Sequence, residues 1–157
     1  MYKKIVVPLD GSQLAECVLP HVETIAKACE LPEVIFLQVI EPPPTPFTYR
    51  YVSEEERQKF EAEDSAEARK TAEDYLDSVV KSTNYGGANV HSEVIIGNPA
   101  EIIADYASKN EVDLVVIATH GRSGVSRWAF GSVADRILRS SCVPVLMVKA
   151  PGCVIGI

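Results

Sequence analysis

Short segments rich in Val, Ile and Leu alternate with longer segments of helical periodicity along the chain, and this alternation limits the fold more than any other feature. Five segments have the composition of strands, and they span residues 3–9, 34–40, 90–96, 112–119 and 143–148. The second and fourth are apolar almost throughout, which is typical of strands covered on both faces of a parallel sheet. We therefore predict a three-layer, doubly wound α/β sandwich, with a five-stranded parallel sheet in the order 3-2-1-4-5 and four helices.

The four helices are expected to begin near residues 13, 53, 98 and 132. Pro20 lies inside the first helical pattern and predicts a kink or a local break there. Ser53 and Glu56 have the spacing of a capping box, so the second helix begins at a well-defined point. Its apolar residues are sparse, and most of its surface is expected to be solvated. Asn98 followed by Pro99 gives the third helix a strong start.

The length of 157 residues corresponds to one ordinary domain. We expect this domain to occupy residues 1–150. Four prolines within residues 42–46 define a proline-rich loop over residues 41–52, which can be neither helix nor central strand. An acidic helix over residues 53–80 follows the loop, and residues 151–157 are expected to form a C-terminal tail.

The formal net charge is −7, but the charges are unevenly distributed. Residues 53–77 hold ten of the 22 acidic side chains and only four basic ones. Residues 120–140 carry four arginines against one aspartate, and this basic region is where we expect a functional site. The negative total argues against a protein that binds nucleic acid or an anionic membrane. No signal peptide and no apolar stretch of about 20 residues is recognisable, so we expect a cytoplasmic protein.

Two of the predicted strand ends carry residues suited to ligand binding. In doubly wound sheets, ligands bind beyond the carboxyl ends of strands, where the winding reverses. Asp10 follows the first strand and suits a sugar hydroxyl or an amine. The fourth strand is followed by a loop containing Gly121, Gly124 and Gly131, and then by Ser132 at a helix start. Free N–H groups at such a start, together with nearby arginines, favour an anion, most commonly phosphate.

Several common motifs are absent from the sequence. No G-x-G-x-x-G follows the first strand, no Gly-Lys dipeptide occurs, and no G-x-S-x-G is present. The four cysteines and three histidines lack the spacing of metal ligands. We therefore assign no metal ligand and no catalytic residue, and we expect His120 to have a structural role in its loop.

Two end segments carry a resemblance to a known family. The first is Lys4-Ile-Val-Val-Pro-Leu-Asp-Gly-Ser12, and the second runs from Val115 to Lys149 and contains Thr119-His-Gly-Arg-Ser-Gly124 and Phe130-Gly-Ser132. Together with Gly97-Asn-Pro99, they resemble the universal stress protein family over residues 3–149. The resemblance implies the same α/β fold and a homodimer formed through the last strand, here Val143–Val148.

Members of this family belong to ATP-binding and non-binding branches. The binding branch has Gly-x-x-Gly, nine residues, and then Gly-Ser or Gly-Thr. This chain has Ala118-Thr-His-Gly121, nine residues, and Gly131-Ser132, so alanine replaces only the first glycine. Alanine adds one methyl group beside the ribose, and we expect binding to be weakened at most.

The resemblance implies that Asp10 holds the ribose and that the backbone of Val39 meets the adenine edge. The phosphates would contact Gly121, Gly131, Ser132 and the amide of Val133, and charge adds Arg122 and Arg127 to these. The predicted cofactor-binding residues are Pro8, Leu9, Asp10, Val39, Ala118, His120, Gly121, Arg122, Ser123, Gly124, Gly131, Ser132 and Val133. The expected ligand is ATP, with AMP or ADP as alternatives, and Mg²⁺ or Mn²⁺ would arrive with the phosphates.

We expect a nucleotide-dependent regulator in the stress response, with little or no intrinsic hydrolysis and an unidentified protein partner. Two alternatives from other classes stay open at this point. One is a slow hydrolase of ATP or nucleotide esters that uses His120 or Asp10. The other is a nucleotide-free dimeric scaffold whose acidic helix recruits partners.

Overall fold

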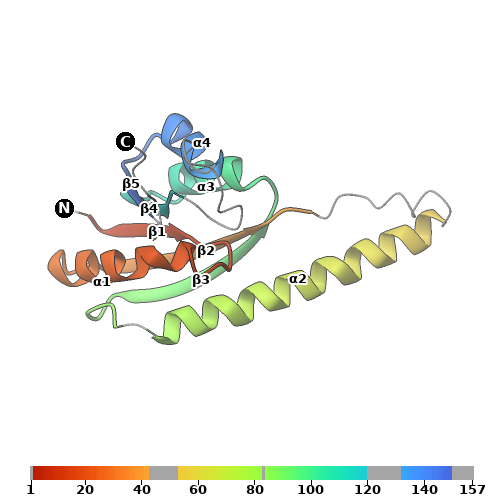
Figure 1. Ribbon diagram of the computed structural model, residues 1–157, viewed down its shortest axis with the longest axis horizontal. Coiled ribbons are helices and arrows are strands. Elements are labelled where there is room, and N and C mark those ends of the chain that lie inside the picture. The colour runs from red at the N-terminus through yellow and green to blue at the C-terminus, as the bar shows by residue number, and fades with distance from the viewer. Residues whose placement is uncertain (1, 43–52, 83, 120–131, 150–157) are drawn as a thin grey trace, which may run out of the picture.

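The computed structural model describes residues 2–42, 53–82, 84–119 and 132–149. Strands and helices alternate along these residues (Figure 1). The strands are β1 (Lys4–Pro8), β2 (Glu33–Ile40), β3 (Asn89–Ile96), β4 (Leu114–Ala118) and β5 (Val145–Val148). The helices are α1 (Leu19–Ala28), α2 (Glu54–Ser82), α3 (Pro99–Lys109) and α4 (Ser132–Ser140), and a short 3-10 helix, η1 (Ala15–Val18), precedes α1.

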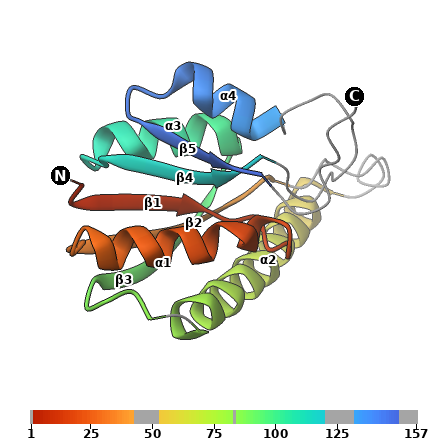
Figure 2. The same ribbon diagram turned by 60° about the vertical axis from the view of Figure 1, so that its left-hand side comes forward.

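All five strands run parallel in one sheet, in the order β3-β2-β1-β4-β5. Helices α1 and α2 cover one face of this sheet, and α3 and α4 cover the other (Figure 2). This arrangement confirms the predicted doubly wound fold, including the strand order. Because the chain crosses from β3 at one edge to β4 on the other side of β1, the winding reverses between β1 and β4.

The burial of each strand explains its composition. Residues Ile5–Pro8 of β1 and all five residues of β4 are buried, since helices cover them on both sides. The edge strands β3 and β5 are mostly half-buried or exposed. Continuous apolar runs therefore mark the central strands, and mixed sequences mark an edge.

The predicted break near Pro20 is present. Residues Ala15–Val18 form η1, and α1 begins at Leu19. Pro20 consequently lies in the first turn of α1, where its missing N–H group is not required for a helical hydrogen bond.

Helix α2 begins at the predicted capping box. The Ser53 N–H donates to Glu56 Oε2 over 3.1 Å, and the Glu56 N–H donates to Ser53 Oγ over 3.3 Å. Only Ala72, Leu76 and Val79 of the described α2 side chains are buried. The amino-terminal half projects beyond the sheet, as Figure 1 shows, so the expectation of a solvated surface is confirmed for the described residues.

Two polar side chains accept hydrogen bonds from backbone N–H groups near α3 and β4. Asn98 caps α3, and its Oδ1 accepts from the N–H groups of Ala100 (3.1 Å) and Glu101 (3.5 Å). Asp113, before β4, accepts at Oδ2 from the N–H groups of Lys3 (2.7 Å) and Lys4 (2.9 Å).

Within the described ranges, no helix combines the length and the apolar character needed to cross a bilayer.

Candidate functional site

The carboxyl ends of β1 and β4 meet where the winding reverses. Val6 and Val115 are register partners, Asp10 lies two residues beyond β1, and Thr119 directly follows β4. Only two of the described polar residues are classed as fully buried, Gln38 (8% exposed) and Thr119 (3%), and both lie at the carboxyl edge of the sheet. Polar groups are rarely buried without a reason, so this edge is the candidate ligand site.

Asp10 organises the turn after β1. Its Oδ1 accepts from the N–H of Ser12 (3.0 Å) and from Ser12 Oγ (2.6 Å), and Gly11 between them has a φ of +81°. Ser12 Oγ in turn accepts from the N–H of Ala15, at the start of η1. Asp10 is therefore a structural residue of this turn, and these hydrogen bonds hold its half-buried side chain at the strand end.

The backbone of Val39 faces the end of β1. Directly after β1, the Leu9 N–H donates a hydrogen bond to the Leu37 carbonyl of β2 over 2.9 Å. Backbone groups of alternate residues point to the same side of a strand, so those of Val39 point the same way as those of Leu37. The Gly97 N–H donates to the Ile40 carbonyl on the opposite side, which agrees with this direction. Val39 thus presents a donor and an acceptor beyond β1, as the edge of a base requires.

The end of β4 and the start of α4 provide the remaining described positions. Ala118 is 7% exposed, and the Thr119 N–H donates to the Val148 carbonyl over 2.8 Å. Val133, the second residue of α4, is half-buried, and N–H groups in a first helical turn have no acceptor within the helix. Figure 2 shows this end of α4 at the same edge of the sheet as the tips of β1 and β4.

The structure thus brings Pro8, Leu9, Asp10, Val39, Ala118 and Val133 to one edge of the sheet. It places the backbone of Ser132 at the first position of α4. The other predicted positions lie outside the described residues, namely His120, Gly121, Arg122, Ser123, Gly124, Arg127 and Gly131.

Two arginines of the basic region lie on the surface of α4. Arg136 is exposed, and Arg139 pairs with Asp135 one turn earlier, with 3.0 Å between Nε and Oδ2. The hydrogen bond and the charge of Asp135 raise the pKa of the Arg139 guanidinium. Both arginines are therefore solvated charges on the helix surface rather than buried contacts of the strand ends.

Tyr75 of α2 is a shielded polar side chain that sequence reasoning missed as a candidate. The hydroxyl oxygen is out of contact with solvent and makes no hydrogen bond of acceptable geometry within the described part of the chain. Burial is the largest cause that raises the pKa of this hydroxyl; the charge and the side-chain hydrogen bond of Glu16 come next, and the charge of Asp10 adds least. Helical spacing predicts that Tyr75 faces the sheet, but no local signal identifies the carboxylates beside it.

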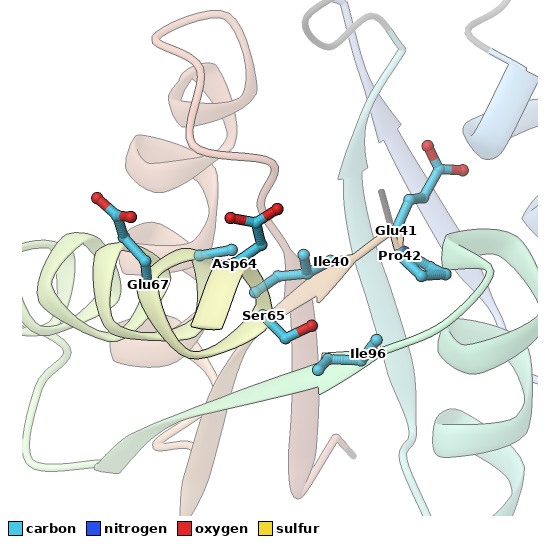
Figure 3. Close-up of a pocket in the computed structure, with 8 residues that line it drawn as sticks. Ile40, Glu41, Pro42, Asp64, Ser65, Glu67 and Ile96 are labelled. Atoms are coloured by element: carbon cyan, nitrogen blue, oxygen red, sulfur yellow. The ribbon is translucent and has the colours of Figure 1, made fainter. Parts of the chain in front are cut away.

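Sequence reasoning also missed a pocket of about 350 Å³ at the ends of β2 and β3. Figure 3 shows Ser65 of α2 directed toward Ile96, whereas the carboxylates of Glu41 and Glu67 point away from Ile96. Its lining residues are Ile40, Glu41, Pro42, Asp64, Ser65, Glu67, Ala68 and Ile96. None of these carries a positive charge, so the pocket does not suit a phosphate group. Within the described residues, no group of three or more His, Cys, Asp or Glu side chains is arranged to hold a metal ion.

Comparison with known proteins agrees with this geometry. The model of the universal stress protein family matches residues 1–149. The chain belongs to the universal stress protein family. Universal stress protein MJ0531 of Methanocaldococcus jannaschii is 34% identical over 151 residues, which cover 96% of this chain and 84% of that protein.

Solved structures of the family share the fold. The structure of hypothetical protein MJ0577, from the same archaeon, has a TM-score of 0.82 and 30% identity over 97% of this chain and 99% of its own. Two more distant structures contain nucleotides. They are an Arabidopsis thaliana family protein with AMP bound (TM-score 0.61, 15% identity, 96% and 93% of the two chains) and the Archaeoglobus fulgidus protein in complex with dAMP (0.57, 21%, 94% and 98%). At these identities the likeness shows the fold alone.

Proposed function

We propose that this universal stress protein binds an adenine nucleotide at the edge where β1, β2 and β4 end. The observation that carries the proposal is that the Asp10 carboxylate and the start of α4 lie on either side of the point where the winding reverses. Asp10 accepts from the ribose, the backbone of Val39 meets the adenine, and the first turn of α4 faces the phosphates. Family structures that contain AMP and dAMP support this choice of ligand.

The ligand is ATP, with AMP or ADP as alternatives, and Mg²⁺ or Mn²⁺ arrives with the phosphates. We propose a cytoplasmic regulatory role in the stress response, in which occupancy of the site, rather than hydrolysis, is the signal to a protein partner. A hydrolase would be favoured instead if the wild type hydrolyses ATP and the His120→Ala variant binds ATP but no longer hydrolyses it.

A binding experiment tests the proposal. Freshly purified protein is extracted with acid, the supernatant is chromatographed for adenine nucleotide, and affinities for ATP with Mg²⁺ and for AMP are measured by calorimetry. Asp10→Asn keeps Oδ1 as an acceptor for Ser12 but removes the charge. It should weaken binding by about 1.5–3 kcal/mol, or roughly 10- to 150-fold. Asp105→Asn is the matched control, because Asp105 pairs only with exposed Lys109 in the described structure. Absence of nucleotide in the extract and of heat in the calorimeter would overturn the proposal.

We further propose a homodimer formed through β5. Among the described strands, β5 has no neighbour at its outer edge. Leu146, a residue of β5, is 37% exposed. The opposite edge, β3, carries the polar residues Asn89, His91 and Glu93, which discourage pairing between edges. Leu146→Glu should convert the dimer to a monomer in light scattering. Leu138→Glu, on α4 and similarly exposed (47%), should leave the dimer intact.

A further inference from the structure

We propose that the pocket between α2 and the ends of β2 and β3 binds a basic segment of a partner protein. The segment inserts one aliphatic side chain over Ile40 and Ile96, and its flanking lysines or arginines meet the acidic rim. The inference rests on the proposed regulatory role, since it gives the protein partner a docking surface. It does not rest on nucleotide binding, because none of the lining residues is a predicted nucleotide contact.

The pocket lies where α2 diverges from the sheet. Leu76 and Ala72 on the inward face of the helix are buried. Ala68 and Ser65 continue the same face at helical spacing but are only half-buried. Their side chains are too small to fill the widening gap, so a volume of about 350 Å³ is left above the strand ends. A larger side chain supplied by another molecule can occupy this volume.

The floor of the pocket is apolar. Ile40 and Ile96 are register partners at the ends of β2 and β3, and Ile40 packs against the core on the α2 side of the sheet. Ile96 is 41% exposed, so a large apolar side chain is in contact with water here. An aliphatic side chain that covers this floor removes apolar surface from water on both partners, which corresponds to about a tenfold gain in affinity.

The rim of the pocket is acidic. Glu41, Asp64 and Glu67 line it, and none of the described lining residues is basic. Because Glu41 and Glu67 point away from Ile96 (Figure 3), their charges lie at the edge of the pocket rather than over its floor. One exposed ion pair contributes less than about fivefold to affinity. The rim therefore selects a cationic partner, and the apolar floor supplies the largest single contribution to binding.

The acidic charge of α2 extends beyond the pocket. Residues 53–77 hold ten acidic side chains and four basic ones, and the described residues before Ala68 are exposed or half-buried. A basic chain segment that lies along the helix meets several of these carboxylates at once, whereas a small cation meets only those at the rim. The charge distribution therefore favours a protein segment as the occupant.

The test measures fluorescence anisotropy of the labelled peptide Lys-Arg-Ser-Leu-Ser-Arg-Lys, without nucleotide, and of its counterpart with serine in place of leucine. Wild type should bind the leucine peptide about tenfold more tightly than the serine peptide. Ser65→Arg places a long cationic side chain in the pocket and should weaken binding of the leucine peptide at least tenfold. An unchanged urea midpoint of this variant shows that it is folded.

Two matched double variants separate the pocket from general attraction to the acidic helix. Asp64→Asn/Glu67→Gln removes two charges of the rim and should weaken the leucine peptide about threefold to tenfold. Glu55→Gln/Asp74→Asn removes two exposed charges of α2 outside the lining and should weaken it less than twofold. Equal losses in the two double variants would overturn the inference, as would equal affinities of wild type for the two peptides.

A second readout does not depend on affinity. In protein labelled with ¹³C at the isoleucine methyl groups, the signals missing from Ile96→Val belong to Ile96, and they should shift with the leucine peptide but not with the serine peptide. Self-association of wild type that Ser65→Arg removes would assign the pocket to a second copy and overturn the inference. A protein that binds AMP but neither peptide would also overturn it and leave the nucleotide site standing. Binding of the leucine peptide without binding of AMP would do the reverse.

Discussion

The Tyr106 hydroxyl donates a 2.5 Å hydrogen bond to Oε1 of Glu93 and so joins α3 to the edge strand β3. Because the acceptor is charged, we expect Tyr106→Phe to lower the free energy of unfolding by about 1–2 kcal/mol. The upper end of the usual range is not expected, since 41% of the Glu93 side chain is exposed. Urea denaturation of both proteins measures the difference, and equal midpoints would show that the bond contributes nothing.

Two tyrosines predict how stability changes at alkaline pH. Burial is the largest cause that raises the pKa values of Tyr75 and Tyr106, and nearby carboxylates add to it. The unfolded chain releases these protons near pH 10, before the folded protein does, so this contribution is complete below about pH 10 and is lost as the pH rises above it. The free energy of unfolding should therefore fall more steeply above pH 10 in wild type than in Tyr75→Phe/Tyr106→Phe. Parallel curves would contradict the prediction.

Asp113 predicts how the free energy of unfolding changes at acid pH. Hydrogen bonds from the N–H groups of Lys3 and Lys4 lower the pKa of its carboxyl group below the usual value. This contribution is present above the pKa of the unfolded chain, about 3.9, and is lost as the pH falls through the folded value. Asp113→Asn should cost about 1–2 kcal/mol at pH 7 and much less near pH 2. Asp105→Asn, which affects only an exposed pair with Lys109, should change stability by less than about 0.5 kcal/mol in the same denaturation series.

The caps of α3 and α2 should differ in their effect on global stability. Asn98→Ala removes the acceptor for Ala100 and Glu101 at a helix packed on the sheet, and should cost about 1 kcal/mol. Ser53→Ala removes an equally well-formed cap from the solvated end of α2 and should barely move the denaturation midpoint. Equal losses in the two variants would contradict this difference.

Ala118 separates affinity from stability. The residue is buried at the end of β4, where the pattern expected of the ATP-binding branch has glycine. Ala118→Gly should raise the affinity for ATP several-fold, while the flexible glycine lowers stability by about 0.5–1 kcal/mol. Calorimetry and denaturation on the same preparation test both effects, and an unchanged affinity would show that the methyl group does not face the ligand.

Much of this fold follows from local patterns. The apolar run Val34–Leu37 marks a covered strand, and Asn98 and Ser53 mark helix starts, because these signals depend on neighbours in sequence. Asp10 could also be predicted from the sequence, since it follows a strand at the edge where α/β folds bind ligands. The surroundings of Tyr75 could not be predicted from the sequence, because they depend on how α2 crosses the sheet. The pocket beside Ile96 depends on the same crossing.

The continuity of α2 hides a division within it. Its carboxyl-terminal turns, anchored by Ala72, Leu76 and Val79, share the core of the sheet, whereas its first turns have almost no apolar contact among the described residues. A helical segment of that length is marginally stable by itself in water. We therefore expect the two halves to behave as separate cooperative units: backbone amides before Ala72 should exchange with solvent through local fraying, and those after it only when the whole sheet opens.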